Sequence, residues 1–149
     1  MDIAEIDWAR LAAFVDGEGS ITIGKQKDQR RTGGYRYYIT VSVYNTNEKL
    51  IDWVVCTFNM SKWGRHDGDP KHKKSFKAYA TRYEAEEILH SIKPWLIIKE
   101  ELADTALELQ STMGKGRGRA HSVSEDDLGF REYLWQKARR LNQKGGTQN

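Results

Sequence analysis

The stretch Leu11–Gly24 reads LAAFVDGEGSITIG and decides how the chain begins to fold. It opens as an apolar run typical of a buried helix, passes through DGEG, and then alternates between apolar and polar residues as a strand does. We expect a helix over residues 8–16, ended by the two glycines of DGEG. Asp16 and Glu18 then stand at a helix C-terminus, which carries partial negative charge and favours cations. Either these acids face open water or a positively charged group sits beside them.

Apolar residues continue at strand and helix spacing along the rest of the chain. They predict two hairpins, each with one apolar and one polar face, and an αββαββα order followed by one further helix. This is an α+β fold in which helices cover one face of an antiparallel four-stranded sheet. We expect a single domain over residues 4–142 and a flexible tail over residues 143–149. Strands are expected over residues 20–27, 37–44, 62–66 and 75–81, and helices over residues 8–16 (with Asp7 as N-cap), 47–58, 83–91, 99–112 and 128–141.

The composition is that of a globular domain: 149 residues, of which 38% are hydrophobic and 30% are charged. Cys56 stands alone, which excludes a disulfide framework and favours a reducing intracellular compartment. No apolar run is long enough to span a membrane, and the N-terminus lacks the pattern of a signal peptide. We therefore expect an intracellular protein.

Charge is segregated along the chain although the net charge is only +3. Residues 25–36 and 62–77 are rich in lysine and arginine, whereas residues 84–108 are mainly acidic. If the two basic blocks share a face, that face suits nucleic acid or another polyanion, and a hydrated charged surface is the alternative. The GKGRGR segment (residues 114–119) lacks the Lys-Ser/Thr ending of a phosphate-binding loop. Its Lys115 and Arg117 either contact DNA phosphates or lie in solvent.

The polar faces of the two hairpins carry donors, acceptors and cations. Such side chains read base edges when a two-stranded ribbon enters the major groove of DNA, and an ordinary hydrated sheet face is the alternative. The amide of Gln26 is suited to pair with both polar atoms of an adenine edge. The candidate DNA contacts are Thr22, Gly24, Gln26, Arg30, Arg36, Tyr38, Thr40, Ser42, Arg65, Lys73, Lys77 and Tyr79, together with Lys115 and Arg117.

The residues LAAFVDGEG resemble the LAGLIDADG motif of homing endonucleases. The two agree at Leu11, Ala12, Asp16 and Gly19. Glu18 stands at the position of the second acid of the motif, and Ala13 replaces a glycine. The expected element order is similar to that of the family over about residues 5–110. The resemblance implies that the sheet forms a saddle on DNA.

The resemblance also implies a site-specific endonuclease that cuts both DNA strands with Mg²⁺. Glu18 would bind the metal with help from the Gly17 carbonyl, and Asp16 would tie the turn together. Asn45, Lys49 and Lys99 match polar and basic positions near the scissile phosphate. Oxygen ligands and phosphate favour Mg²⁺. Mn²⁺ would substitute for it, whereas Ca²⁺ would bind without supporting cleavage.

A single motif implies a homodimer that reads a pseudo-palindromic target. The resemblance places the dimer contact on the motif helix, at Leu11, Ala12, Ala13, Val15 and Asp16. Such a protein would act on double-stranded DNA in a prokaryotic cytoplasm or in an organelle, without a membrane partner. Three alternatives stay open: a maturase that binds its own intron RNA, a DNA-binding protein without nuclease activity, and a protein-interaction domain with no salt-sensitive DNA affinity.

Overall fold

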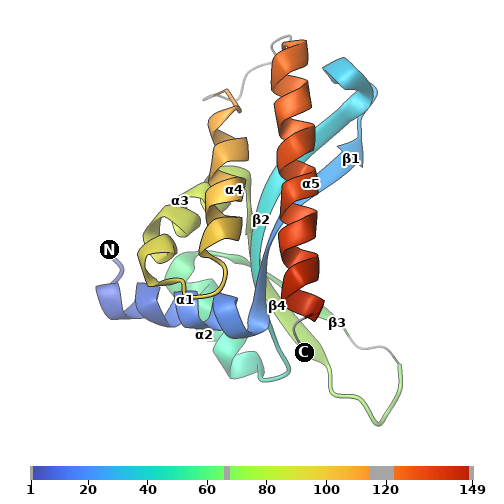
Figure 1. The fold of residues 1–149 in the computed structure, drawn as a ribbon. Helices are drawn as coiled ribbons and strands as arrows, with labels where there is room; N and C mark the ends of the chain where they lie inside the picture. Colours follow the sequence, from blue (N-terminus) through green and yellow to red (C-terminus); the bar gives the residue numbers. More distant parts are fainter. Residues whose placement is uncertain (1, 66–67, 115–122, 148–149) are drawn as a thin grey trace.

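The computed structural model describes residues 2–65, 68–114 and 123–147 (Figure 1). Its elements follow the expected order αββαββα with one further helix. They are α1 (Glu5–Glu18), β1 (Gly19–Lys27), β2 (Tyr35–Asn45), α2 (Glu48–Phe58), β3 (Ser61–Arg65), β4 (Ser75–Thr81), α3 (Arg82–Ile92), α4 (Glu100–Ser111) and α5 (Glu125–Thr147), with 3-10 turns at Thr32–Gly34 and Lys93–Trp95.

The four strands form one antiparallel sheet in the order β1-β2-β4-β3. In the first hairpin Ile23 lies opposite Ile39, and Thr22 lies opposite Thr40. Paired residues of an antiparallel sheet point to the same side, so each rung is either apolar or polar. The expected α+β fold with one apolar and one polar sheet face is therefore confirmed.

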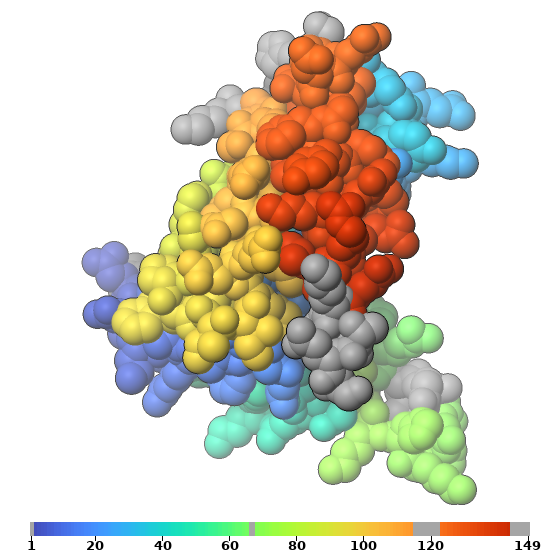
Figure 2. Space-filling view, viewed as in Figure 1, coloured from blue at the N-terminus to red at the C-terminus, as the bar shows by residue number. Residues whose placement is uncertain are grey.

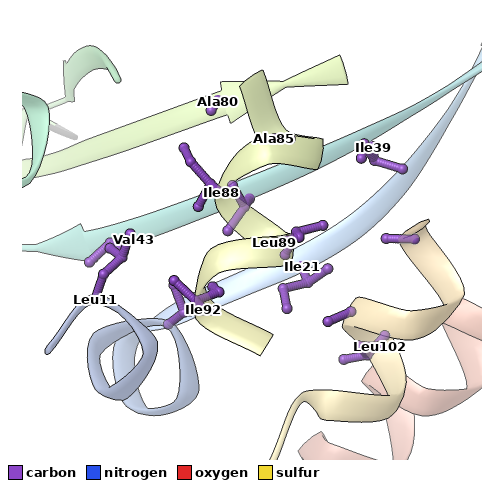
Figure 3. Packing of buried hydrophobic residues seen from close by; sticks show 14 of the residues in the cluster. Leu11, Ile21, Ile39, Val43, Ala80, Ala85, Ile88, Leu89, Ile92 and Leu102 are labelled. Carbon is purple, nitrogen blue, oxygen red and sulfur yellow. The ribbon is translucent and has the colours of Figure 1, made fainter. Parts of the chain in front are cut away.

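Helices α1, α3 and α4 pack on the apolar face of the sheet (Figure 3). Leu11 of α1 and Leu89 of α3 are fully buried there, together with Ile39 and Val43 of β2. Full burial of a side chain of this size contributes about 1.5–3 kcal/mol. This packing holds α1 against the sheet and so fixes where its C-terminal end lies.

The last helix, α5, lies along β1 and buries Leu134 (Figure 1). Its Glu132 accepts a hydrogen bond from the Tyr37 hydroxyl and pairs with the Lys25 ammonium group at 2.9 Å. Burial disfavours the charged form of Glu132, but hydrogen bonds from Tyr37, Lys25 and Gln136 outweigh it and lower the pKa of Glu132. Lys25, although part of the first basic block, is therefore held on the helix-covered side.

The bounds of two helices, α1 and α5, differ most from the sequence-based expectation. Helix α1 begins at Glu5, so Asp7 lies within its first turn and does not cap it. The helix also runs through Gly17 and ends at Glu18, because an interior glycine costs only about 1 kcal/mol and the buried face is already packed. Helix α5 continues to Thr147, past residue 142, where a flexible tail was expected to begin.

The covered side of the molecule is formed by α4 and α5, which lie side by side (Figure 2). The tip of the first hairpin emerges beside the upper end of α5, and the second hairpin projects at the lower right of the view. No helix among the described residues is long and apolar enough to cross a membrane.

Candidate nucleic-acid interface and active site

The C-terminal end of α1 presents an exposed carboxylate, that of Glu18, beside the end of β2. The Asn45 Nδ2 donates a hydrogen bond to the Glu18 Oε2 at 2.5 Å. The orientation of the Asn45 amide is set by its other atom, because Oδ1 accepts from the Asn47 backbone N–H at 2.7 Å. Glu18 is thus positioned by a neighbouring side chain while its other oxygen stays unbound by the described residues.

Asp16 has a different role from Glu18. Its carboxylate accepts three backbone N–H bonds, from Ile97 at 2.7 Å, Ile98 at 3.2 Å and Lys99 at 3.0 Å. These residues lead directly into α4, whose N-terminal end favours negative charge. Asp16 therefore ties the end of α1 to the start of α4.

Lys99 places a positive charge at the end of α1, which is one of the two arrangements that the sequence left open for the acids there. Its Nζ donates to the Asp16 backbone carbonyl at 2.7 Å. This carbonyl belongs to the last turn of α1, so the ammonium group neutralises the negative end of that helix. Because this contact is with a backbone carbonyl, it does not use the carboxylate of Asp16 or that of Glu18.

Lys49 is the one expected active-site residue that the structure does not bring into contact with this group. It lies in the first turn of α2, where its backbone N–H donates to the N-cap side chain of Asn47 at 3.1 Å. Its exposed ammonium group makes no hydrogen bond or ion pair with the described residues. Lys62, by contrast, pairs with Glu48 and Asp52 of the same helix at 2.7 and 2.6 Å.

The ligand types at this end of α1 fit a hard divalent cation. Glu18 offers a carboxylate, and Gly17 is exposed, with no atom within 4 Å of the place where a Cβ would stand. Oxygen ligands of this kind suit Mg²⁺ or Ca²⁺. No group of three His, Cys, Asp or Glu residues comes together in the described part of the chain.

The uncovered polar face of the first hairpin is a ladder of paired side chains. Ser20 pairs with Ser42, and their hydroxyl groups are hydrogen bonded at 2.8 Å. Ser42 is only 1% exposed, so the expectation that it contacts DNA is corrected: neighbouring strands cover it on both sides. Thr22 and Thr40 form the next rung and are half exposed, as expected of candidate contacts.

The outer rungs of this hairpin are already bonded to one another. Gly24 lies under the ring of Tyr38, because a Cβ on Gly24 would stand 2.3 Å from the Tyr38 Cζ. Gly24 therefore makes room for Tyr38 and does not itself form an open contact surface. In the next rung the Arg36 Nη2 donates to the Gln26 Oε1. The Gln26 amide is thus not free for the two-point adenine contact expected from the sequence.

The uncovered face also carries two exposed aromatic residues, Tyr44 of β2 and Trp63 of β3, that were not among the sequence-based candidates. Tyr44, Lys77 and Trp63 form one rung across three strands. Trp63 is 48% exposed and Tyr44 is 43% exposed. Lys77 lies 5.5 Å from the Tyr44 ring centre and 5.1 Å from that of Tyr79. The expected strand over residues 62–66 could have indicated Trp63 as a candidate contact, because this strand pairs Trp63 with Lys77.

The remaining candidate DNA contacts lie toward the hairpin ends. Arg65 ends β3, and Lys73 is exposed in the segment before β4. Arg30 is exposed and pairs with Asp28 at 3.4 Å. Lys115 and Arg117 lie outside the described residues.

The structure corrects the expected dimer contact on α1. Leu11, Ala12 and Val15 are all 0% exposed, because they pack into the core of their own chain. Ala13 is exposed and Asp16 is half-buried. The uncovered stripe of the helix is formed by Ile6, Arg10, Ala13 and Gly17, with Ile97 and Ile98 beyond its C-terminal end. Any contact made by this helix has to use that stripe.

No protein-family model matches the sequence, and no curated protein matches it. Solved structures do match the fold. The homing endonuclease I-CvuI in complex with its target gives a TM-score of 0.76 at 16% identity, covering 92% of this chain and 82% of that chain. The archaeal intron-encoded homing endonuclease I-Vdi141I, complexed with DNA, gives 0.74 at 13% identity, covering 92% and 84%.

A third match has a different coverage. The I-SmaMI LAGLIDADG homing endonuclease bound to cleaved DNA gives a TM-score of 0.69 at 15% identity, covering 89% of this chain but 45% of that chain. The chain therefore has the fold of the LAGLIDADG homing endonucleases. It holds one αββαββα unit, which accounts for most of the I-CvuI chain and for less than half of the I-SmaMI chain.

Proposed function

We propose that the protein is a site-specific endonuclease that hydrolyses both strands of a long, pseudo-palindromic DNA target with a divalent metal. The observation that carries this proposal is the arrangement at the end of α1. There an exposed Glu18 is oriented by Asn45, and the Lys99 ammonium group is held 2.7 Å from the Asp16 carbonyl. These groups stand at one end of an uncovered polar sheet face, as a DNA-cutting site requires.

Each of these residues has a task in phosphodiester hydrolysis. Glu18, with the Gly17 carbonyl, would hold Mg²⁺. A bound Mg²⁺ would polarise the phosphate and make a bound water more acidic. Mn²⁺ would serve in its place, and Ca²⁺ would bind without supporting cleavage. Lys99 places a positive charge where negative charge develops on the phosphate. Asn45 keeps the Glu18 carboxylate directed outward, and Lys49 adds a cation at the start of α2.

The polar face supplies sequence recognition. Strand β1 has 9 residues, which span about 30 Å in an extended strand. Base pairs rise about 3.4 Å each, so one chain covers roughly nine base pairs. Thr22, Thr40, Lys77 and Tyr79 would contact bases on this face, while Arg30, Arg65 and Lys73 would contact phosphates near the hairpin ends.

Cutting both strands requires two Glu18 side chains and therefore two copies of the chain. We propose a twofold dimer in which the exposed stripe of α1 packs on its counterpart. Small residues such as Ala13 allow two helices to approach closely, and Ile97 is 88% exposed beside this stripe. The dimer would read about twice the length of one half-site, in inverted repeat. It would act in a prokaryotic cytoplasm or in an organelle, where DNA is accessible.

The test is cleavage-site selection from a randomised double-stranded DNA library with Mg²⁺, using the full-length protein. We expect one long site of inverted-repeat symmetry, cut on both strands. The Glu18→Gln variant, run in parallel, controls for contaminating nuclease. Selective binding without cleavage would identify a DNA-binding protein, and affinity for structured intron RNA alone would identify a maturase. Either result would overturn the proposal.

A further inference from the structure

On the uncovered face of the first hairpin, the outermost rung joins two long polar side chains. Gln26 of β1 lies directly opposite Arg36 of β2, on the uncovered face of the sheet. The Arg36 Nη2 donates a hydrogen bond to the Gln26 Oε1. The two residues therefore present themselves to a ligand as one unit.

The side chain of Arg36 lies over the ring of Tyr38. Its guanidinium carbon lies 5.8 Å from the centre of the Tyr38 ring. The Tyr38 ring in turn lies against Gly24, whose missing side chain leaves the space that the ring occupies. The Arg36 Nε is buried and makes no hydrogen bond with the described residues, so its outward donors are those of the terminal nitrogens.

Counting donors and acceptors shows what this rung offers to DNA. A glutamine amide has one acceptor oxygen and one NH₂ group, whereas a guanidinium has donors only. The Arg36 contact uses the oxygen of Gln26. Turning the amide over would set its NH₂ group against the guanidinium donors, so the bonded orientation is the stable one. The rung therefore offers donors from Gln26 Nε2 and from Arg36, together with a positive charge.

We propose that the Gln26–Arg36 rung recognises guanine, one position in each half-site, through the O6 and N7 acceptors of its major-groove edge. Guanine offers two acceptors there, which match a donor-only unit. Adenine offers one acceptor and one donor, and its donor requires the oxygen that Arg36 already occupies. This inference rests on the proposed DNA-binding function and adds the base that one part of the interface selects.

Two substitutions change the hydrogen-bonding pattern of this rung in different ways. Arg36→Leu keeps an apolar side chain over Tyr38 but releases the Gln26 oxygen, so the preferred base should change from guanine to adenine. Gln26→Glu keeps the acceptor for Arg36 and removes the NH₂ donor, so the preference for guanine should fall. One good two-point contact corresponds to about tenfold discrimination or more.

Arg139→Leu is the matched control. Arg139 also lies over an aromatic ring, 4.8 Å from the centre of Trp135, but on α5. Losing this guanidinium removes the same charge without altering the hairpin ladder. Its base profile should equal that of the wild-type protein at every position.

The experiment is binding selection from a randomised double-stranded DNA library with Ca²⁺, for the full-length wild type and the three variants, followed by sequencing of the bound fraction. We expect guanine in the wild type and adenine in Arg36→Leu, at one position and its symmetry mate. A uniform loss of affinity in Arg36→Leu, with no altered base, would make Arg36 a phosphate contact and overturn the inference alone. A wild-type protein that selects no sequence at all would overturn the proposed function together with it.

Discussion

The covered and the uncovered faces of the first hairpin use similar residues for different purposes. Lys25 and Arg36 belong to the same basic block of the sequence, yet Lys25 pairs with Glu132 under α5 and Arg36 lies on the open face beside Gln26. The two residues lie on different strands, and the register places Lys25 opposite Tyr37 and Arg36 opposite Gln26. Because successive side chains of a strand point to opposite sides, these two neighbouring rungs lie on opposite faces of the sheet. The difference shows that a cluster of charges in the sequence does not identify a binding surface until each residue has been assigned to a face.

The same contrast holds at the end of α1 for Asp16 and Glu18. Asp16 accepts three backbone hydrogen bonds and so stabilises the fold. Glu18 is exposed, and among the described residues its only hydrogen bond is with the Asn45 amide. Substitution of a residue on the covered side should therefore change the free energy of unfolding. Substitution of a residue on the uncovered side should change DNA binding or cleavage.

The largest effect on the covered side is expected from Leu11→Ala. Leu11 is 0% exposed in the core, so truncation should lower the free energy of unfolding by about 2–5 kcal/mol. Denaturant unfolding, monitored by circular dichroism, measures this loss. If the midpoint of denaturant unfolding is unchanged and the dimer is weakened, Leu11 contacts a second copy of the chain and not its own core.

On the uncovered stripe of α1, Ala13→Arg should separate the two copies of the proposed dimer. Two arginines would meet across the twofold axis, and like charges at an interface cost several kcal/mol, which corresponds to association weaker by about 100-fold or more. Sedimentation velocity gives the oligomeric state, and unfolding should be little changed. As a control, Ala12→Leu on the buried side should lower stability by about 1–3 kcal/mol through overpacking. A dimer that survives Ala13→Arg would exclude this stripe as the contact.

Lys99→Met should slow cleavage by about 10- to 100-fold while weakening DNA binding far less, because the lost charge acts mainly on the transition state. Lys93→Met is the matched control, since Lys93 is the other base of the acidic stretch and pairs with Asp104. Single-turnover cleavage and binding in Ca²⁺ separate the two effects. Equal losses of rate and affinity would make Lys99 a simple phosphate contact.

The smallest effect is expected at Glu132. Its folded pKa is lowered because hydrogen bonds from Tyr37, Lys25 and Gln136 outweigh its burial. Its contribution to stability is therefore complete above the ordinary carboxyl pKa, near 4.3, and is lost as pH falls through the lowered folded value. Unfolding of wild type and Glu132→Gln at pH 7 and at pH 3 should differ most at pH 7. A difference that grows toward acid pH would reverse the sign of this argument.

The element order and the split between apolar and polar faces could be predicted because both follow from periodicity along a single strand or helix. The resemblance implied only that Asp16 ties its own turn together. Its bonds to the start of α4 could not be foreseen, since they join residues far apart in the sequence. The burial of Ser42 and the Gln26–Arg36 bond could not be foreseen, because both depend on the register between strands. The buried side of α1 was misassigned for a related reason: a motif shared with other proteins does not say which of its residues face the chain's own core.

The central claim is that Glu18 is a catalytic carboxylate that the fold does not need. The direct measurement compares Glu18→Gln with Asp16→Asn for unfolding free energy, for DNA affinity in Ca²⁺ and for cleavage in Mg²⁺. We expect Glu18→Gln to keep the wild-type stability, within about 0.5 kcal/mol, to retain most of the affinity and to lose cleavage. Asp16→Asn should lower stability by about 1–3 kcal/mol through its weakened backbone hydrogen bonds. The claim would be contradicted if the purified Glu18→Gln variant cleaved DNA at the wild-type rate. It would also be contradicted if this variant lost as much stability as Asp16→Asn.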